Sequence, residues 1–239
     1  MWDNPRLLNA AAGFLTALAL VVFAVAALQL LLRSPLFPLR EIEIRGSLAH
    51  TSRQEIDQAA RGRVAGNFFS VDLAGLRTAL EALPWVRAVQ VRRVWPDRLE
   101  VELEEHVALA RWGGDGLVDA QGERFPGSGG GALPLFAGPA GTEGELTRRY
   151  RAFVAILAPL GTVPGQVVLS ARRAWQLQLD DGLLLELGRD APGDPVESRL
   201  GRFVAAYPQT LGRMTQKVGH VDLRYPNGFA LRVADNRGG

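Results

Sequence analysis

The sequence RRVWPDRLEVELEE, residues 92–105, has the pattern of a β-hairpin with one buried face. A basic stretch enters a Trp-Pro-Asp turn, and strict alternation of apolar and acidic residues leaves it. Successive side chains of a strand point to opposite faces, so the apolar and acidic residues separate. The apolar set is Leu99, Val101 and Leu103, and the acidic set is Glu100, Glu102 and Glu104. We expect three arginines to lie beside the acidic set and to help fix the register of the two strands. They are Arg87, Arg92 and Arg98.

The residues before this hairpin predict one more strand and two short helices. LREIEIRG, residues 39–46, alternates with Ile42 and Ile44 facing inward. Ser52 and Glu55 have the spacing of a capping box, which predicts a helix start. Leucines at three- and four-residue spacing between 73 and 83 predict a second helix, which Pro84 ends. Residues 39–106 therefore predict a β-α-α-β-β unit with both helices on one face of the sheet.

The N-terminal segment is apolar enough to span a membrane. Residues 7–32 contain no charged side chain, and a helix of that length exceeds the roughly 30 Å of a hydrocarbon core. We expect a transmembrane helix over residues 7–33 after a tail of residues 1–6. The alternative is a signal peptide cleaved near Ala24-Val25-Ala26, but the apolar run continues past that point. Flanking charges give no clear orientation.

The remaining chain, residues 107–234, predicts a sheet-rich α+β unit with a tail of residues 235–239. Turn residues indicate hairpins at 119–122, at Asp181-Gly182 and at 226–228. Apolar residues at helical spacing predict helices over 146–157 and 196–207. The last predicted strand, residues 229–233, has the place of an edge strand. Such an edge either receives a partner's strand or is blunted, here by Arg232, and the pattern leaves both open.

The composition gives no indication of catalysis or of a bound cofactor. The chain has no cysteine, a formal net charge of +2, and no dense basic face of the kind that binds nucleic acid. The glycine-rich stretch 126–134 lacks the strand–loop–helix context and the Lys-Ser/Thr of a phosphate loop. His50, His106 and His220 have no second ligand at helical spacing, so we expect surface or strand histidines and no metal site.

LPWVRAVQVRRVWPDRLEVELEEHVALARW, residues 83–112, and LVDAQGERF, residues 117–125, resemble the FtsQ family of bacterial cell-division proteins, called DivIB in Gram-positive bacteria. The first folded unit resembles a POTRA domain. The resemblance implies a single-pass protein of the inner membrane at the division septum, with a cytoplasmic N-terminus and periplasmic domains. It implies a non-enzymatic scaffold that binds FtsB and FtsL, and other division proteins through the POTRA domain and the membrane helix. The 92–105 hairpin would then form the edge of a small docking domain just outside the membrane.

The same resemblance suggests where a partner binds. DLRYPNG places Arg224 and Tyr225 at the family's partner surface, and ARRAWQ places Arg173 beside it. Arginines there would pair with acidic residues of FtsB. The main chain of the last strand would supply hydrogen bonds to an FtsB segment. The expected partner-binding set is Arg173, Arg224, Tyr225, Gly228, Phe229, Ala230, Leu231, Arg232 and Val233.

Two alternatives from other classes remain at this stage. One is a periplasmic cell-wall hydrolase or its chaperone. The other is an outer-membrane assembly module, because POTRA units occur there as well. The absence from the sequence of a run of alternating ten-residue strands argues against the second alternative.

Overall fold

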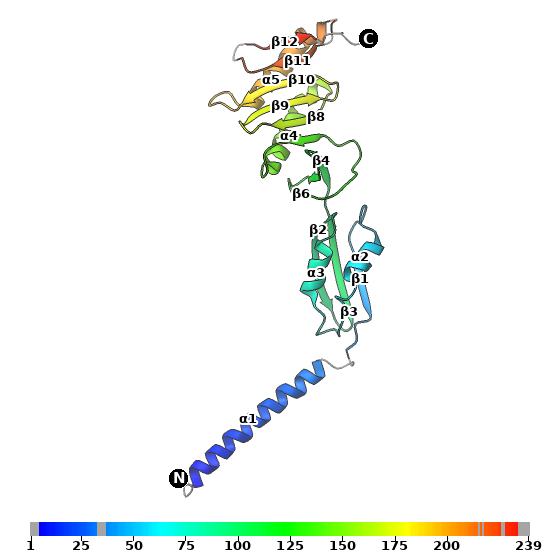
Figure 1. Cartoon of the computed structure of the whole chain (residues 1–239), viewed down its shortest axis with the longest axis vertical. Helices are drawn as coiled ribbons and strands as arrows, with labels where there is room; N and C mark the ends of the chain where they lie inside the picture. The colour runs from blue at the N-terminus through cyan, green and yellow to red at the C-terminus, as the bar shows by residue number, and fades with distance from the viewer. Residues whose placement is uncertain (1–4, 33–36, 215, 217, 226–227, 234–239) are drawn as a thin grey trace. The chain divides into compact units, whose positions relative to one another are not determined.

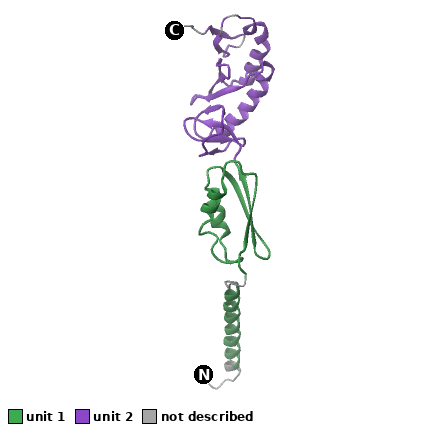
Figure 2. Cartoon of the chain, turned by 90° about the vertical axis from the view of Figure 1, so that its right-hand side faces the viewer, with its two compact units in different colours: residues 1–105 green, residues 106–239 purple. Residues whose placement is uncertain are grey.

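The computed structural model describes residues 5–32, 37–214, 216, 218–225 and 228–233. The chain divides into two compact units, residues 1–105 and 106–239, coloured separately in Figure 2. Several predicted features lie outside the described residues: most of the N-terminal tail, Arg33, the turn residues 226 and 227, and the chain beyond Val233.

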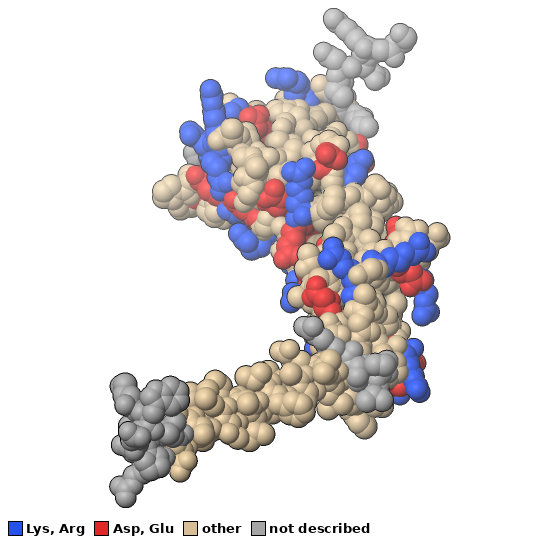
Figure 3. Space-filling model, turned by 60° about the horizontal axis from the view of Figure 1, so that its bottom comes forward, with Lys and Arg blue, Asp and Glu red and all other residues tan. Residues whose placement is uncertain are grey.

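The first element is a long apolar helix, α1 (Pro5–Leu32). Its 28 residues correspond to about 42 Å. Within the described part of the chain, residues 9–31 form the one helical stretch with the length and composition of a membrane span. Figure 3 shows the described side chains of α1 without a charged group.

The rest of the first unit has the predicted β-α-α-β-β order (Figure 1). Its elements are β1 (Glu41–Arg45), α2 (Arg53–Ala60), α3 (Leu73–Glu81), β2 (Val86–Val94) and β3 (Arg98–Glu105). The strand order is β1-β3-β2, with β1 parallel and β2 antiparallel to β3. The expectation that the 92–105 hairpin forms the edge is therefore wrong for its second strand, because β1 pairs with the far side of β3. The edges are β1 and β2.

Burial follows the alternation read from the sequence, with one departure. Leu99, Val101 and Leu103 lie in a core with Leu76 and Leu80 of α3. On the opposite, polar face, central Glu100 is only 7% exposed. Its Oε1 accepts from Arg92 at 2.6 Å and lies 3.3 Å from Arg45. A carboxylate in the middle strand is covered here because arginines reach it from both neighbouring strands. Of the other two arginines expected beside the acids, Arg87 does pair with Glu104, whereas Arg98 pairs across to Glu41 of β1.

The two short helices have defined N-termini. The Ser52 hydroxyl accepts from the Glu55 N–H while the Glu55 carboxylate accepts from the Ser52 N–H, which is the predicted capping box. Asp72 caps α3 through the Gly75 N–H. Glu105, at the end of β3, accepts the N–H groups of residues 49–51 and thereby ties the loop before α2 to the sheet.

The described residues of the second unit form a nine-stranded mixed sheet with two helices. Its strands are β4 (Ala108–Trp112), β5 (Leu117–Asp119), β6 (Arg124–Phe125), β7 (Leu135–Ala137), β8 (Pro164–Leu169), β9 (Ala174–Leu179), β10 (Leu184–Arg189), β11 (Val218–Asp222) and β12 (Ala230–Val233). The helices are α4 (Glu143–Leu157) and α5 (Val196–Ala206), with 3-10 turns at 158–160, 207–209 and 211–213. The strand order is β12-β11-β10-β9-β8-β7-β4-β5-β6.

The core of this unit lies between the helices and one face of the sheet. Trp175, Leu177 and Leu179 alternate into it from β9, as predicted, and Phe153 and Phe203 enter from α4 and α5. The hairpins at 119–122 and 181–182 are present. Strands β4, β7 and β8 were not predicted, and two parallel pairs, β4 with β7 and β7 with β8, join them.

Candidate partner-binding edge

The strand β12 lies at the edge of the nine-stranded sheet. It pairs antiparallel with β11, in the register Asp222 to Ala230, Val221 to Leu231 and His220 to Arg232. All four of its residues are exposed. A strand paired on one side presents alternate N–H and C=O groups on the other side.

The two faces of β12 differ in character. Leu231 lies opposite Val221, which is buried beneath the helices, so Leu231 points to the helical side. Ala230 and Arg232 lie opposite Asp222 and His220 on the polar side of the sheet. A strand added here would thus meet an apolar position on one side and charged positions on the other.

Phe229 was expected to begin the last strand, and this is wrong. The strand starts at Ala230, and the Phe229 ring packs edge-on against Phe203 of α5, with centroids 5.8 Å apart. The large aromatic ring gains more from this partly buried site than from the exposed strand. Phe229 therefore fixes the start of β12 against the helix.

Arg224, just after β11, is held in an ion-pair cluster on the polar side. Its guanidinium donates to both Asp222 carboxylate oxygens, at 2.6 Å and 2.9 Å, and lies 3.2 Å from Glu186 of β10. The hydrogen bond with Asp222 raises the pKa of Arg224 and lowers that of Asp222. About half of the Arg224 side chain stays accessible, so it presents a fixed cation beside the edge.

A groove adjoins the edge on the helical side. It has a volume of ≈ 360 Å³ and is bordered by Tyr225, Gly228 and Phe229 together with residues of α5. Tyr225 is exposed at its rim. Sequence reasoning missed the helical wall, formed by Arg199, Arg202, Phe203 and Ala206. The sequence pattern predicted only that these positions belong to a helix.

Arg173 is not brought to the edge itself. It lies in the turn between β8 and β9 with a positive φ of 63°, and pairs with Glu145 of α4 at 2.5 Å. The strand β9 is three strand spacings from β12, or about 14 Å. The two do share one end of the sheet, because the start of β9 pairs with the end of β10 and β10 runs parallel to β11.

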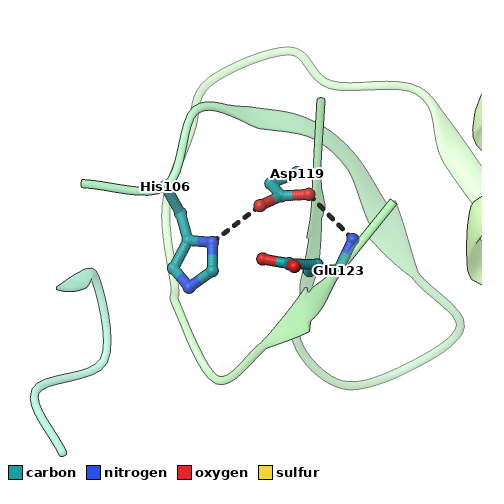
Figure 4. A group of neighbouring side chains, drawn as sticks. All are labelled: His106, Asp119 and Glu123. Carbon is teal, nitrogen blue, oxygen red and sulfur yellow. Dashed lines mark hydrogen bonds and ion pairs between the residues drawn. The ribbon is translucent and has the colours of Figure 1, made fainter. Parts of the chain in front are cut away.

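A second cluster, far from the edge in the strand order, involves His106, which was expected to be a surface or strand histidine. It is buried, and its Nδ1 lies 2.8 Å from Oδ2 of Asp119 (Figure 4). Asp119 Oδ1 accepts the N–H groups of Gln121 and Glu123. One ligand atom each from His106, Asp119 and Glu123 lies within 4.8 Å of the others. Asp119 Oδ1 closes the β5–β6 turn and Asp119 Oδ2 pairs with His106, so hydrogen bonding explains the cluster. The partners are 13 residues apart, beyond any local spacing rule.

Known proteins resemble this chain over its whole length. Residues 37–106 match the family model "POTRA domain, FtsQ-type", and residues 110–224 match "Cell division protein FtsQ/DivIB, C-terminal". The protein named Cell division protein FtsQ of Burkholderia pseudomallei is 45% identical over 99% of this chain and 96% of its own length. The proteins of that name from Nitrosospira multiformis and Neisseria gonorrhoeae are 40% and 32% identical, over 97% and 98% of this chain and 99% and 96% of their own lengths.

The two family models cover both folded units, and the matches to the relatives include the N-terminal helix as well. They agree with an architecture of one apolar helix, a β-α-α-β-β unit and a sheet-rich unit with flanking helices. The chain belongs to the FtsQ/DivIB family of bacterial cell-division proteins, with an FtsQ-type POTRA domain followed by the family's C-terminal domain.

Proposed function

We propose that this protein is a non-enzymatic scaffold of the cell-division machinery that captures FtsB by β-strand addition at β12. The observation that carries the proposal is an exposed edge strand with a groove on one side and a fixed arginine on the other. Main-chain bonds along β12 would give affinity, and the two flanking features would select the partner's side chains.

Arginine side chains near the edge would offer hydrogen-bond donors to acidic residues of FtsB, although the ion pairs of Arg224 with Asp222 and Glu186 offset its charge. Arg224 presents its accessible half beside the strand, and Arg232 projects from the strand on the same side. Arg173 lies about 14 Å away at the same end of the sheet, so it would contact a part of FtsB that extends beyond the added strand. FtsL would join through its complex with FtsB.

The arrangement in the cell follows from this role. Residues 1–6 form a cytoplasmic tail, residues 7–33 span the inner membrane, and units 39–106 and 107–234 lie in the periplasm at the septum, with a short tail of residues 235–239. The POTRA domain and the membrane helix contact other division proteins, so the scaffold links early and late components. The apolar α1 and membership of the FtsQ family support this assignment.

The test uses proline as a probe of main-chain donors in β12. Leu231→Pro and Arg232→Pro form a matched pair, because the N–H groups of neighbouring residues point to opposite sides of the strand. The full-length chain in a lipid nanodisc is titrated calorimetrically with the periplasmic segment of the same organism's FtsB, and the melting temperature is recorded.

We expect the variant that loses the outward donor to lose binding at an unchanged melting temperature. The other variant breaks a bond to β11 and melts earlier. Tyr225→Ala should weaken binding without changing the fold, because its ring is exposed at the rim of the groove. Wild-type affinity in both proline variants would exclude strand addition at β12.

A further inference from the structure

The POTRA domain carries exposed aromatic rings at the end where the chain enters it. Trp95, in the turn between β2 and β3, is 75% exposed, and Phe69, in the loop before α3, is 41% exposed. The start of β1 lies at this same end, because β1 begins opposite the start of β3. We call Phe37, Phe69 and Trp95 the aromatic tip.

The aromatic tip is held in place by contacts of its own domain. The rings of Phe37 and Phe69 meet edge-on at 5.1 Å, and the Phe68 N–H donates to the Phe37 carbonyl at 3.0 Å. Arg93, two residues before Trp95, donates to the carbonyls of Phe68 and Phe69. The tip is therefore preformed. Its exposed rings leave apolar surface in water, and the fold forgoes the stabilisation that burying this surface would give.

A second contact joins the entering chain to the Trp95 turn. The Arg40 N–H donates to the Asp97 carbonyl at 2.9 Å, so the segment after Phe37 runs along the turn that carries Trp95. The entry point and the exposed indole thus belong to one surface.

The chain length limits how far this surface can lie from α1. Five residue steps separate Leu32, the last residue of α1, from Phe37. A fully extended chain covers at most about 3.6 Å per residue, so the two are no more than about 18 Å apart. The headgroup layer flanking a roughly 30 Å hydrocarbon core is itself several ångströms thick. If α1 spans the bilayer, the aromatic tip lies within reach of that layer.

Two arginines beside the tip pair with acids, and the Arg93 guanidinium is directed to main-chain carbonyls of its own domain. Arg40 lies 3.9 Å from Asp97, and Arg98 lies 3.2 Å from Glu41. Attraction to anionic lipids is therefore a minor part of any binding here, and the rings carry it. Tryptophan is enriched at membrane interfaces because one part of its ring is apolar and its N–H is polar.

We propose that the aromatic tip inserts into the headgroup layer of the bilayer that α1 spans and docks the POTRA domain on the membrane surface. This inference rests on the membrane anchoring of the proposed function. It is independent of FtsB, because it uses the other folded unit and a lipid surface in place of a protein partner.

The absence of cysteine allows a direct measurement of depth. Nitroxides are attached to single cysteines in the full-length chain, reconstituted in nanodiscs of zwitterionic phosphatidylcholine. Asp97→Cys reports on the tip, and Val163→Cys, an exposed site in the second unit, reports on water. Leu20→Cys, in the middle of α1, reports on membrane insertion. Collisions with oxygen, which concentrates in lipid, are compared with those of a water-soluble nickel complex.

We expect the oxygen-to-nickel accessibility ratio at 97 to lie between those at 20 and 163. Adding the substitutions Trp95→Ser and Phe69→Ser to the Asp97→Cys chain should lower the ratio at 97 to the value at 163. The melting curve followed by circular dichroism should stay unchanged. A ratio at 97 equal to that at 163, with a high ratio at 20, would overturn the docking and leave the anchoring intact. A low ratio at 20 would overturn both.

Discussion

Arg199 joins α5 to the end of β10 through one buried guanidinium. It is 7% exposed and donates to the carbonyls of Leu187 and Arg189 and to both the main chain and the carboxylate of Asp194. The sequence analysis included position 199 in the predicted helix 196–207 and did not mark it as buried, because arginine is seldom buried. The four acceptors explain why it is buried here, since a paired guanidinium keeps its hydrogen bonds.

Replacing this side chain should be costly. We expect Arg199→Met to lower the free energy of unfolding by roughly 3 kcal/mol, because buried acceptors lose their donor. Arg202→Met is the matched control, since Arg202 pairs with the same Asp194 but its side chain is 49% exposed. Its cost should stay under about 1 kcal/mol. Urea denaturation of both variants measures the difference, and equal costs would contradict this account.

The stability of the POTRA domain should depend on pH through the carboxyl group of Glu105. Burial acts to raise the pKa of its carboxyl, but hydrogen bonds from Ala49, Thr51 and His50 outweigh this effect and hold the pKa below its ordinary value. A carboxyl with a lowered folded pKa stabilises the fold above its unfolded pKa, about 4.3. That stabilisation is lost as the pH falls through the folded pKa.

We therefore expect Glu105→Gln to destabilise the first unit at pH 7, by about 2 kcal/mol, and to matter much less near pH 3. Thermal melts of both forms between pH 7 and pH 3 measure the two curves. Curves that stay parallel over this range would show that the charge of Glu105 is not what holds the loop. Glu104→Gln is a control, because its carboxylate faces the opposite, exposed side of the strand.

A register shift in the strand β10 affects the candidate edge. The register with β9 shifts between Glu186 and Gly188, and Gly188 has a φ of +75°. A Cβ at this position would lie 2.8 Å from Cγ of Arg224. The glycine therefore allows the strand to bend and leaves room for the arginine of the candidate edge.

Gly188→Ala should both strain the backbone and displace Arg224. Gly193→Ala is a matched control, because its φ is +78° but a Cβ there meets nothing within 4 Å. We expect Gly193→Ala to cost about 1 kcal/mol of stability and Gly188→Ala clearly more. Denaturant melts measure both, and titration with FtsB should show weaker binding for Gly188→Ala alone. Identical behaviour of the two would mean that the contact with Arg224 is unimportant.

Local sequence patterns predicted the helices, strands and turns better than they predicted which strands pair with each other. The capping box at Ser52, the alternation in β3 and the Asp181-Gly182 turn each depend on residues within a few positions, and each is confirmed. The parallel pairing of β1 with β3 joins residues more than 50 positions apart, and no local rule predicts it. The edge position of β12 was suggested by its place in the chain, whereas the helical wall of the groove was not.

The limit of local patterns is clearest at single side chains with distant partners. His106 looked like an isolated histidine because Asp119 lies beyond any helical spacing. Phe229 looked like a strand residue because it continues the apolar pattern, yet Phe203 offers it a partly buried site. In both residues the tertiary contact decided the outcome.

Over the whole molecule, the described residues form two separate cores. One cluster of buried residues includes Leu80 and Val101 of the first unit, and the other includes Phe153 and Trp175 of the second. A domain with its own core can unfold as a unit of its own. The expected partner surface and the aromatic tip thus depend on different cores.

We expect Leu80→Ala to lower the transition of the first unit by 2–5 kcal/mol, about the range for emptying a buried leucine site, and to leave that of the second unchanged. Phe153→Ala should do the reverse. Scanning calorimetry of the full-length chain separates the transitions. A shift of both by one substitution would indicate that the units unfold together.

The strand β12 contributes four exposed residues and none of the buried core cluster. A protease that cut the chain after Phe229 would therefore remove the strand to which we propose that FtsB is added, and would leave the rest of the sheet folded, with β11 as its new edge. Under the proposed function, such a clipped molecule would keep its membrane anchor and its POTRA domain. It would then compete with the intact protein for a place in the division machinery, so the loss of residues 230–239 would be dominant over the remaining intact copies.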